Sequence, residues 1–193
     1  MKIEIAKKSD LSGFFQYITL QLADNGRAGN PLFQPISPDQ NELSVPARQR
    51  FMQGVTTLVR EPGWRLLWLA KDASGRIMGH IDLRPYDDDF CQHRVLLGMG
   101  VDKHFRRQGI GRLLIEHAIA YCRSQNWISW LDLNVLSNNL AAKNLYLDRG
   151  FRLCGEIADR YRIEGNSISE LSMTINTDIS LEKKDEKNGL YQG

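Results

Sequence analysis

The sequence predicts an α/β protein of the α+β type, with one domain, a mixed and mostly antiparallel sheet of six to seven strands, and about four helices. Three observations carry this prediction. The 193 residues suffice for one well-filled core and are few for two. Apolar residues alternate in several short segments and recur with helical spacing in others. The segments follow the order β-α-α-β-β-β-α-β-α-β-β.

The first half of the chain is expected to hold one strand, two helices and three antiparallel strands. "KIEIA" alternates as a strand does, and a helix capped by Ser9 follows it. Residues 25–44 are rich in Pro, Asn, Gly and Ser, which predicts a long loop at the rim of a functional site. Pro46 can open the second helix. The hairpin "RLLWLAKDASGRIMGHIDLRP" and the run "HRVLLGMGV" supply the three strands.

The second half is expected to continue with two helices and three strands. A helix follows the glycines near residue 110, and then come strand "WISWLDLNV" and helix "NLAAKNLYLDRG". The strands "FRLCGEIADRYRI" and "ISELSMTI" are joined by the turn "EGNS". We assign residues 1–177 to the domain. Residues 178–193 are polar and charged, so we expect a mobile tail there.

Composition and charge exclude several classes of function. The net charge of +2 gives no general case for nucleic acid or an acidic membrane as partner. The three cysteines and four histidines lack the spacing of a metal site, so we expect no metal. The start of the chain lacks the apolar run of a signal peptide, and no stretch has the ~20 apolar residues of a membrane span. We therefore expect a cytoplasmic protein, and the sequence leaves a homodimer open.

The segment "RRQGIG" crowds two arginines and two glycines where a helix begins. A helix start offers unpaired backbone N–H groups and partial positive charge, so this segment predicts a phosphate site. The P-loop pattern is absent. "GMGVDK" begins like a dinucleotide fingerprint, but Lys103 stands at its third glycine position and the helix starts too late.

Two motifs indicate a family. "VDKHFRRQGIGRLL" resembles the pyrophosphate-binding signature of the GNAT superfamily of N-acetyltransferases, R-x-x-G-x-G, at the start of a helix. "NLAAKNLYLDRGF" is similar to the second signature of that family, N-x-x-A-x-x-L-Y-x-x-x-G-F. The resemblance covers residues 99–151. The matching positions are Arg106, Gly109, Gly111, Asn139, Ala142, Leu145, Tyr146, Gly150 and Phe151.

The resemblance implies acetyl-CoA as cosubstrate, without a metal. In the family, backbone N–H groups of the first signature cradle the pyrophosphate, and two splayed strands leave an edge that pairs with the pantetheine arm. Asn139 stands where the family holds that arm, and it can also cap the following helix. The cofactor-binding residues expected are Met99, Gly100, Val101, Arg106, Arg107, Gln108, Gly109, Ile110, Gly111, Arg112 and Asn139.

Acetyl transfer to an amine needs a neutral amine and a proton for the departing thiolate. Tyr146 stands at the general-acid position of the family. Members that acetylate protein N-termini commonly carry Glu where this chain has Asn134, which cannot act as a base. Strand alternation places Asp132 on the same face, so Asp132 is our first candidate base. Glu156, Asp82 and His80 are the alternates.

The resemblance implies transfer to an amine, and we favour a primary amine of a small molecule or amino-acid derivative as the acceptor. A peptide or protein N-terminus or lysine is the alternative acceptor. Residues 25–44, "YDDDF" and the terminal hairpin around "DRYRIEGNS" are expected to border the acceptor site, where Asp87–Asp89 and Asp159 could attract a cationic amine. A rival from another class is a non-catalytic acyl-CoA sensor: Tyr146 argues against it, and the absence of Glu at position 134 argues for it.

Overall fold

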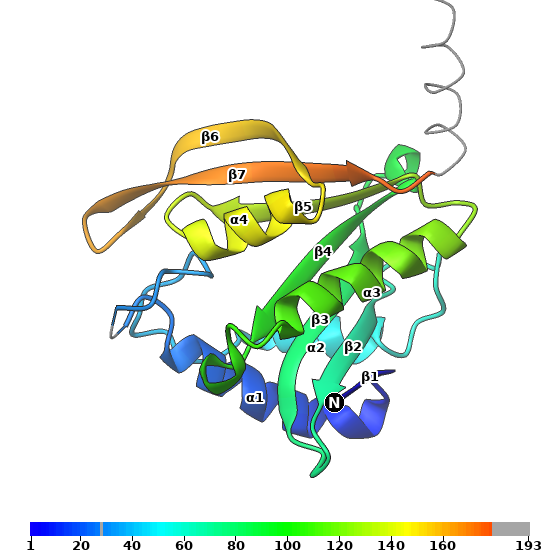
Figure 1. The fold of residues 1–193 in the computed structure, drawn as a ribbon, viewed down its shortest axis with the longest axis horizontal. Coiled ribbons are helices and arrows are strands. Elements are labelled where there is room, and N and C mark those ends of the chain that lie inside the picture. The colour runs from blue at the N-terminus through cyan, green and yellow to red at the C-terminus, as the bar shows by residue number, and fades with distance from the viewer. Residues whose placement is uncertain (28, 179–193) are drawn as a thin grey trace, which may run out of the picture.

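The computed structural model describes residues 1–27 and 29–178, and one seven-stranded sheet organises them (Figure 1). The strand order is β1-β2-β3-β4-β5-β7-β6. Neighbouring strands are antiparallel except β4 and β5, which are parallel. The predicted fold class is confirmed. The strands are β1 Lys2–Ile5, β2 Leu66–Lys71, β3 Ile77–Pro85, β4 Arg94–Val101, β5 Trp130–Leu136, β6 Arg152–Ile163 and β7 Asn166–Asn176.

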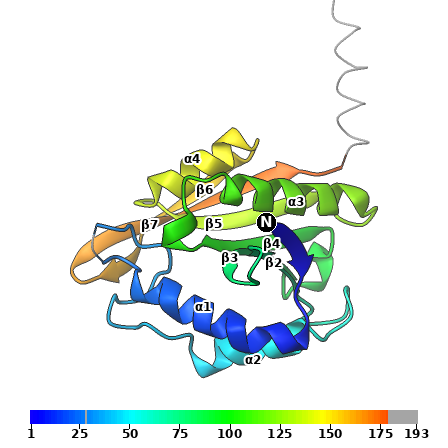
Figure 2. The ribbon, with the colours of Figure 1, turned by 60° about the horizontal axis from the view of Figure 1, so that its bottom comes forward.

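Helices cover both faces of the sheet. They are α1 Leu11–Ala23, α2 Val45–Gly54, α3 Ile110–Ser124 and α4 Leu140–Asp148, in the order predicted. Figure 2 shows α1 and α2 on one side of the strands and α3 and α4 on the other. We call these sides the α1 face and the α3 face. Short 3-10 turns at residues 8–10, 89–91 and 103–105 complete the described elements.

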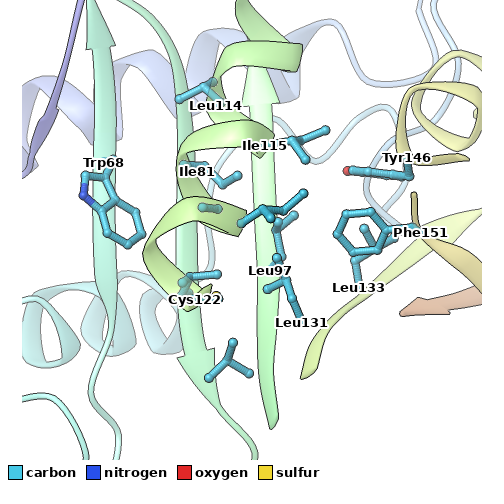
Figure 3. Close-up of a cluster of buried hydrophobic side chains, with 14 of the residues drawn as sticks. Trp68, Ile81, Leu97, Leu114, Ile115, Cys122, Leu131, Leu133, Tyr146 and Phe151 are labelled. Carbon is cyan, nitrogen blue, oxygen red and sulfur yellow. The ribbon is translucent and has the colours of Figure 1, made fainter. Parts of the chain in front are cut away.

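Each face has its own apolar core because side chains alternate along the strands. On the α3 face, Leu114 of α3 belongs to one core with Ile81, Leu97, Leu131 and Leu133 of the sheet, and Figure 3 shows Leu133 beside Phe151. Burial of such a side chain contributes ~1.5–3 kcal/mol. On the α1 face, Phe14 of α1 packs on β2.

A third apolar cluster joins segments that are far apart in the sequence. Leu136 at the end of β5 packs with Ile163 and Ile168 of the β6–β7 hairpin. Leu32, from the connection between α1 and α2, packs against the same cluster. This contact brings residues 25–44 and the β6–β7 hairpin together. They are two of the three segments predicted to border the acceptor site.

The predicted tail, residues 178–193, lies outside the described residues apart from Asp178. Among the helices that the structure describes, none is long and apolar enough to cross a membrane.

Candidate functional site

The parallel strands β4 and β5 part soon after they meet. They pair only at Arg94↔Trp130, Val95↔Leu131 and Leu96↔Asp132, although β4 continues to Val101 and β5 to Leu136. Figure 1 shows the two strands diverging from their shared end. Beyond Leu96, the edge of β4 that faces β5 has no strand ladder, so its backbone groups can bond an extended ligand.

The helix α3 begins beside this opening with an unusual backbone. Arg107 and Gly109 both have positive φ, of 59° and 81°. Only glycine adopts this region without strain, and a Cβ built on Gly109 would meet nothing within 4 Å. The first backbone N–H groups of a helix have no partner inside it. The segment therefore presents donors to open space, which suits an anion.

The three arginines of the segment lie differently. Arg106 donates from Nε to the carbonyl of Val101 at 3.1 Å and from Nη1 to Oδ1 of Asn30 at 2.9 Å. Its side chain thus ties the loop to the end of β4. Arg112 pairs with Glu116, and Arg107 is exposed. The loop is also bonded internally, because Gln108 donates to the carbonyl of His104.

Gly111 lies in a packed place. A Cβ there would stand 3.1 Å from Leu145 of α4 and 3.5 Å from Met99 of β4. Glycine therefore lets the first turn of α3 approach α4 and β4 closely. From the sequence, we expected Gly111, like Gly109, only to let the backbone come close to the phosphates. The motif contains no signal that one glycine has a packing role and the other does not.

The second motif forms helix α4 and places Tyr146 beside the opening. Oδ1 of Asn139 accepts from the backbone N–H of Ala142 at 3.3 Å and caps this helix. Tyr146 is 7% exposed and packs on Phe151 at 5.7 Å between ring centroids. Figure 3 shows its hydroxyl directed towards Ile115 of α3. Burial raises the pKa of the phenol, so it stays protonated at neutral pH.

Asp132 lies on the α1 face, within the part of β5 that pairs with β4. Arg94 donates to both carboxylate oxygens, at 2.8 and 2.6 Å. Tyr86 donates to Oδ2 at 3.0 Å and Thr174 to Oδ1 at 2.5 Å. The carboxylate is thus bonded on both oxygens and paired with a cation. Asn134, two residues on, accepts from Ser172.

Asp82, one of the alternates, is also paired on the α1 face. Both Arg65 and Arg84 donate to its Oδ2 atom, and the carboxylate is buried. Glu156 lies elsewhere: it is exposed on edge strand β6, opposite Leu171, whose side chain belongs to the core of the α3 face.

His80 pairs with Gly100 in the ladder between β3 and β4, next to the unpaired edge. The Tyr17 hydroxyl donates to the Gly100 carbonyl at 3.0 Å and lies 3.2 Å from Nδ1 of His80. Because the Tyr17 hydroxyl donates its proton to Gly100, it can only accept a hydrogen bond from His80. The proton of the neutral His80 ring is therefore on Nδ1, and Nε2 keeps its lone pair. Burial lowers the pKa of His80 to about 4, so the ring is neutral.

The acidic residues predicted at the rim divide into two groups. Asp87–Asp89 are partly or fully exposed. Asp159 accepts from Arg162 and from the Ser167 hydroxyl, so its charge is compensated. The connection between α1 and α2 is organised by the fully buried Asn25, whose Oδ1 accepts from the N–H groups of Phe33 and Gln34.

Two surface pockets lie apart from the opening. One, of ≈ 310 Å³, surrounds Trp64 and Tyr86, and the other, of ≈ 350 Å³, lies at Glu116 and Arg149. The site is therefore defined by strand edges and a helix start. Within residues 1–27 and 29–178, no group of three or more His, Cys, Asp or Glu could hold a metal ion.

Comparison with solved structures finds the same fold. The ribosomal-protein-alanine N-acetyltransferase of Brucella melitensis aligns with a TM-score of 0.72 at 20% identity, over 91% of this chain and 99% of its own. A GNAT superfamily phosphinothricin acetyltransferase from Sinorhizobium meliloti, in complex with acetyl-CoA, aligns with a TM-score of 0.71 at 17% identity, over 92% and 88%.

Sequence comparison adds a relative and a family. The chain is 30% identical to the N-acetylaspartate synthetase of Danio rerio over 120 residues, which are 62% of this chain and 41% of that relative. It thus spans less than half of that protein. The model of the acetyltransferase (GNAT) family matches residues 33–151, which hold both motifs and the diverging strands. The chain belongs to the acetyltransferase (GNAT) family.

Proposed function

We propose that this protein transfers the acetyl group of acetyl-CoA to the primary amine of a small molecule or amino-acid derivative, by direct attack in a ternary complex. The main support for the proposal is that β4 and β5 diverge soon after they pair. Beside this divergence, helix α3 starts at Gly109, whose φ is in the left-handed region. The acetyl-CoA bound to the S. meliloti neighbour supports the choice of donor.

The residues present fit this donor. The N–H groups of residues 108–112 would bond the pyrophosphate, with charge from Arg107 and Arg112, while Arg106 would hold the loop in place. The free edge of Met99–Val101 would bond the pantetheine amides. Asn139 would cap α4 and approach the same arm.

The reaction forms a C–N bond at the acetyl carbonyl and breaks the C–S bond. Tyr146 would give its hydroxyl proton to the departing thiolate, and burial keeps that proton in place until then. The amine must lose a proton. Asp132 stays our first hypothesis for the base, and Arg94 donates to both of its carboxylate oxygens. The Nε2 lone pair of His80 is the alternative.

The names of relatives include both a protein acceptor and small-molecule acceptors, so only this chain's own residues can favour one class. Asn134 replaces the Glu expected of enzymes that modify protein N-termini. This favours a small molecule, with a peptide or protein amine as the alternative.

The test is release of free CoA thiol from acetyl-CoA in the presence of a panel of amines, amino acids and short peptides. The proposal expects amine-dependent release and an N-acetylated product by mass spectrometry. Acetyl-CoA binding without release for any acceptor would support the sensor and contradict the enzyme. Release with peptides alone would move the acceptor to the alternative class.

A further inference from the structure

The α1 face carries an excess of positive charge next to the diverging strands. Arg65 and Arg84 share one oxygen of Asp82, so two guanidinium groups have one carboxylate between them. The side chain of Arg65 is 11% exposed and that of Asp82 is 4% exposed. Burial is the main cause that lowers the pKa of Arg65; the charge of Asp82 raises this pKa, and the charges of Arg84 and Arg50 lower it further. One of the two guanidinium groups therefore has no carboxylate of its own, and a partly buried cation of this kind can bind an anionic ligand.

Arg84 lies where β4 leaves β5. Asp82 is opposite Gly98 in the β3–β4 ladder, and Gly98 is two residues past Leu96, the last residue of β4 that pairs with β5. A Cβ on Gly98 would lie 2.5 Å from Oδ1 of Asp82 and 3.1 Å from Nη1 of Arg84. Glycine at position 98 thus admits the guanidinium over β4, on the face opposite α3.

Arg84 has hydrogen-bonding capacity to spare. Its side chain is 35% exposed. Within the described part of the chain, its hydrogen bond is the one from Nη1 to Oδ2 of Asp82, at 3.3 Å. A guanidinium offers five N–H donors in a planar fork that matches a carboxylate. The other buried carboxylate nearby, Asp132, is already bonded twice by Arg94, and His80 is neutral. The donors of Arg84 are therefore available to a ligand.

We propose that Arg84 binds a carboxylate of the acceptor, so that the substrate is an amine that also carries a carboxylate, such as a free amino acid. The inference rests on the proposed function and narrows its acceptor class. Arg65, held over the ring of Phe51 at 4.2 Å, supports Asp82 and keeps the pair in place. A peptide N-terminus has no carboxylate beside its amine and would lose this contact.

The experiment compares amino acids with their own carboxamides as acceptors, by thiol release, in the wild type and in Arg84→Gln. The amine of a carboxamide differs in basicity, so the quantity to compare is the ratio of kcat/KM for acid over amide. Because intrinsic amine reactivity cancels between the two proteins, the change in this ratio reports the carboxylate contact. We expect the ratio to fall by ~10- to 100-fold in Arg84→Gln, mainly through KM.

Two further variants complete the test. Arg84→Lys keeps the charge without the fork and should recover part of the preference. Arg123→Gln, at the end of α3 on the other face, removes an equal charge and should leave the ratio unchanged. An unchanged ratio in Arg84→Gln would overturn the inference alone. Absence of transfer to every acceptor would instead contradict the proposed function on which it rests.

Discussion

Tyr146 is the residue that we propose as the general acid. The ring is buried on Phe151 and burial raises the pKa of its hydroxyl. A phenol with a raised pKa holds its proton at neutral pH, so Tyr146 is in the protonated form that a general acid needs.

We predict that Tyr146→Phe lowers kcat by ~10²-fold while KM for acetyl-CoA changes far less, because the hydroxyl acts as the thiolate leaves. Tyr121→Phe is the control, since Tyr121 is a half-buried tyrosine whose pKa is also raised and which packs on Trp68. Pre-steady-state kinetics should be used to isolate the chemical step. An unchanged rate for that step in Tyr146→Phe would remove the residue from the mechanism.

At the scale of elements, the hydrogen bonds of Asp132 connect strands β4, β5 and β7 in the region where β4 and β5 are still paired. Arg94 lies on β4, Asp132 on β5 and Thr174 on β7, and all three are mutually bonded. The network holds β4 and β5 together where they pair, immediately before they part. Its structural role and the proposed role as base make different predictions.

Asp132→Asn should lower the free energy of unfolding by ~1–3 kcal/mol, measured by urea denaturation, because the donors of Arg94 lose a charged acceptor. Asp159→Asn, which breaks a solvent-exposed pair with Arg162, should leave stability near the wild-type value. If Asp132 is also the base, kcat/KM should fall most near neutral pH and recover as higher pH deprotonates the amine. A pH profile that overlays the wild type would reject Asp132 as base.

The elements were predictable because their signals are local. Periodicity defined the strands and helices, and the R-x-x-G-x-G segment marked the helix start at Gly109. The pairing of Arg94 with Asp132 was not predictable, because it depends on register between strands that are 38 residues apart in sequence. The packed place of Gly111 likewise depends on how α3 approaches α4.

At the scale of the whole molecule, the two faces of the sheet hold different kinds of buried group. The α3 face holds the larger core and the helix start, and the α1 face holds the buried polar groups His80, Asp82 and Asp132. The alternation of strand residues predicted only that Asp132 would share a face with Asn134. It could not predict that both carboxylates would be bonded to arginines, since that follows from the assembled sheet.

The buried His80 makes the stability of the whole molecule depend on pH. Its pKa is about 4 in the fold and ~6.5 when unfolded, so the unfolded chain binds the proton first as pH falls. Stability from the neutral ring is complete above pH ~6.5 and is lost as pH falls towards 4. Between pH 7 and 5 the urea midpoint of the wild type should fall, and that of His80→Gln should fall less. Equal falls in the two proteins would contradict a buried neutral ring.

The central claim is that the start of α3 binds the phosphates of acetyl-CoA, and calorimetric titration of Gly109→Glu tests it most directly. Gly75 in the β2–β3 turn is the matched control: its φ is 85° against 81° at Gly109, and neither Cβ would meet an atom within 4 Å. Both variants carry the same backbone strain and the same new charge. We predict that acetyl-CoA affinity falls more than ~10-fold in Gly109→Glu and stays at the wild-type value in Gly75→Glu. Wild-type affinity in a folded Gly109→Glu protein, or equal losses in both variants, would contradict the account.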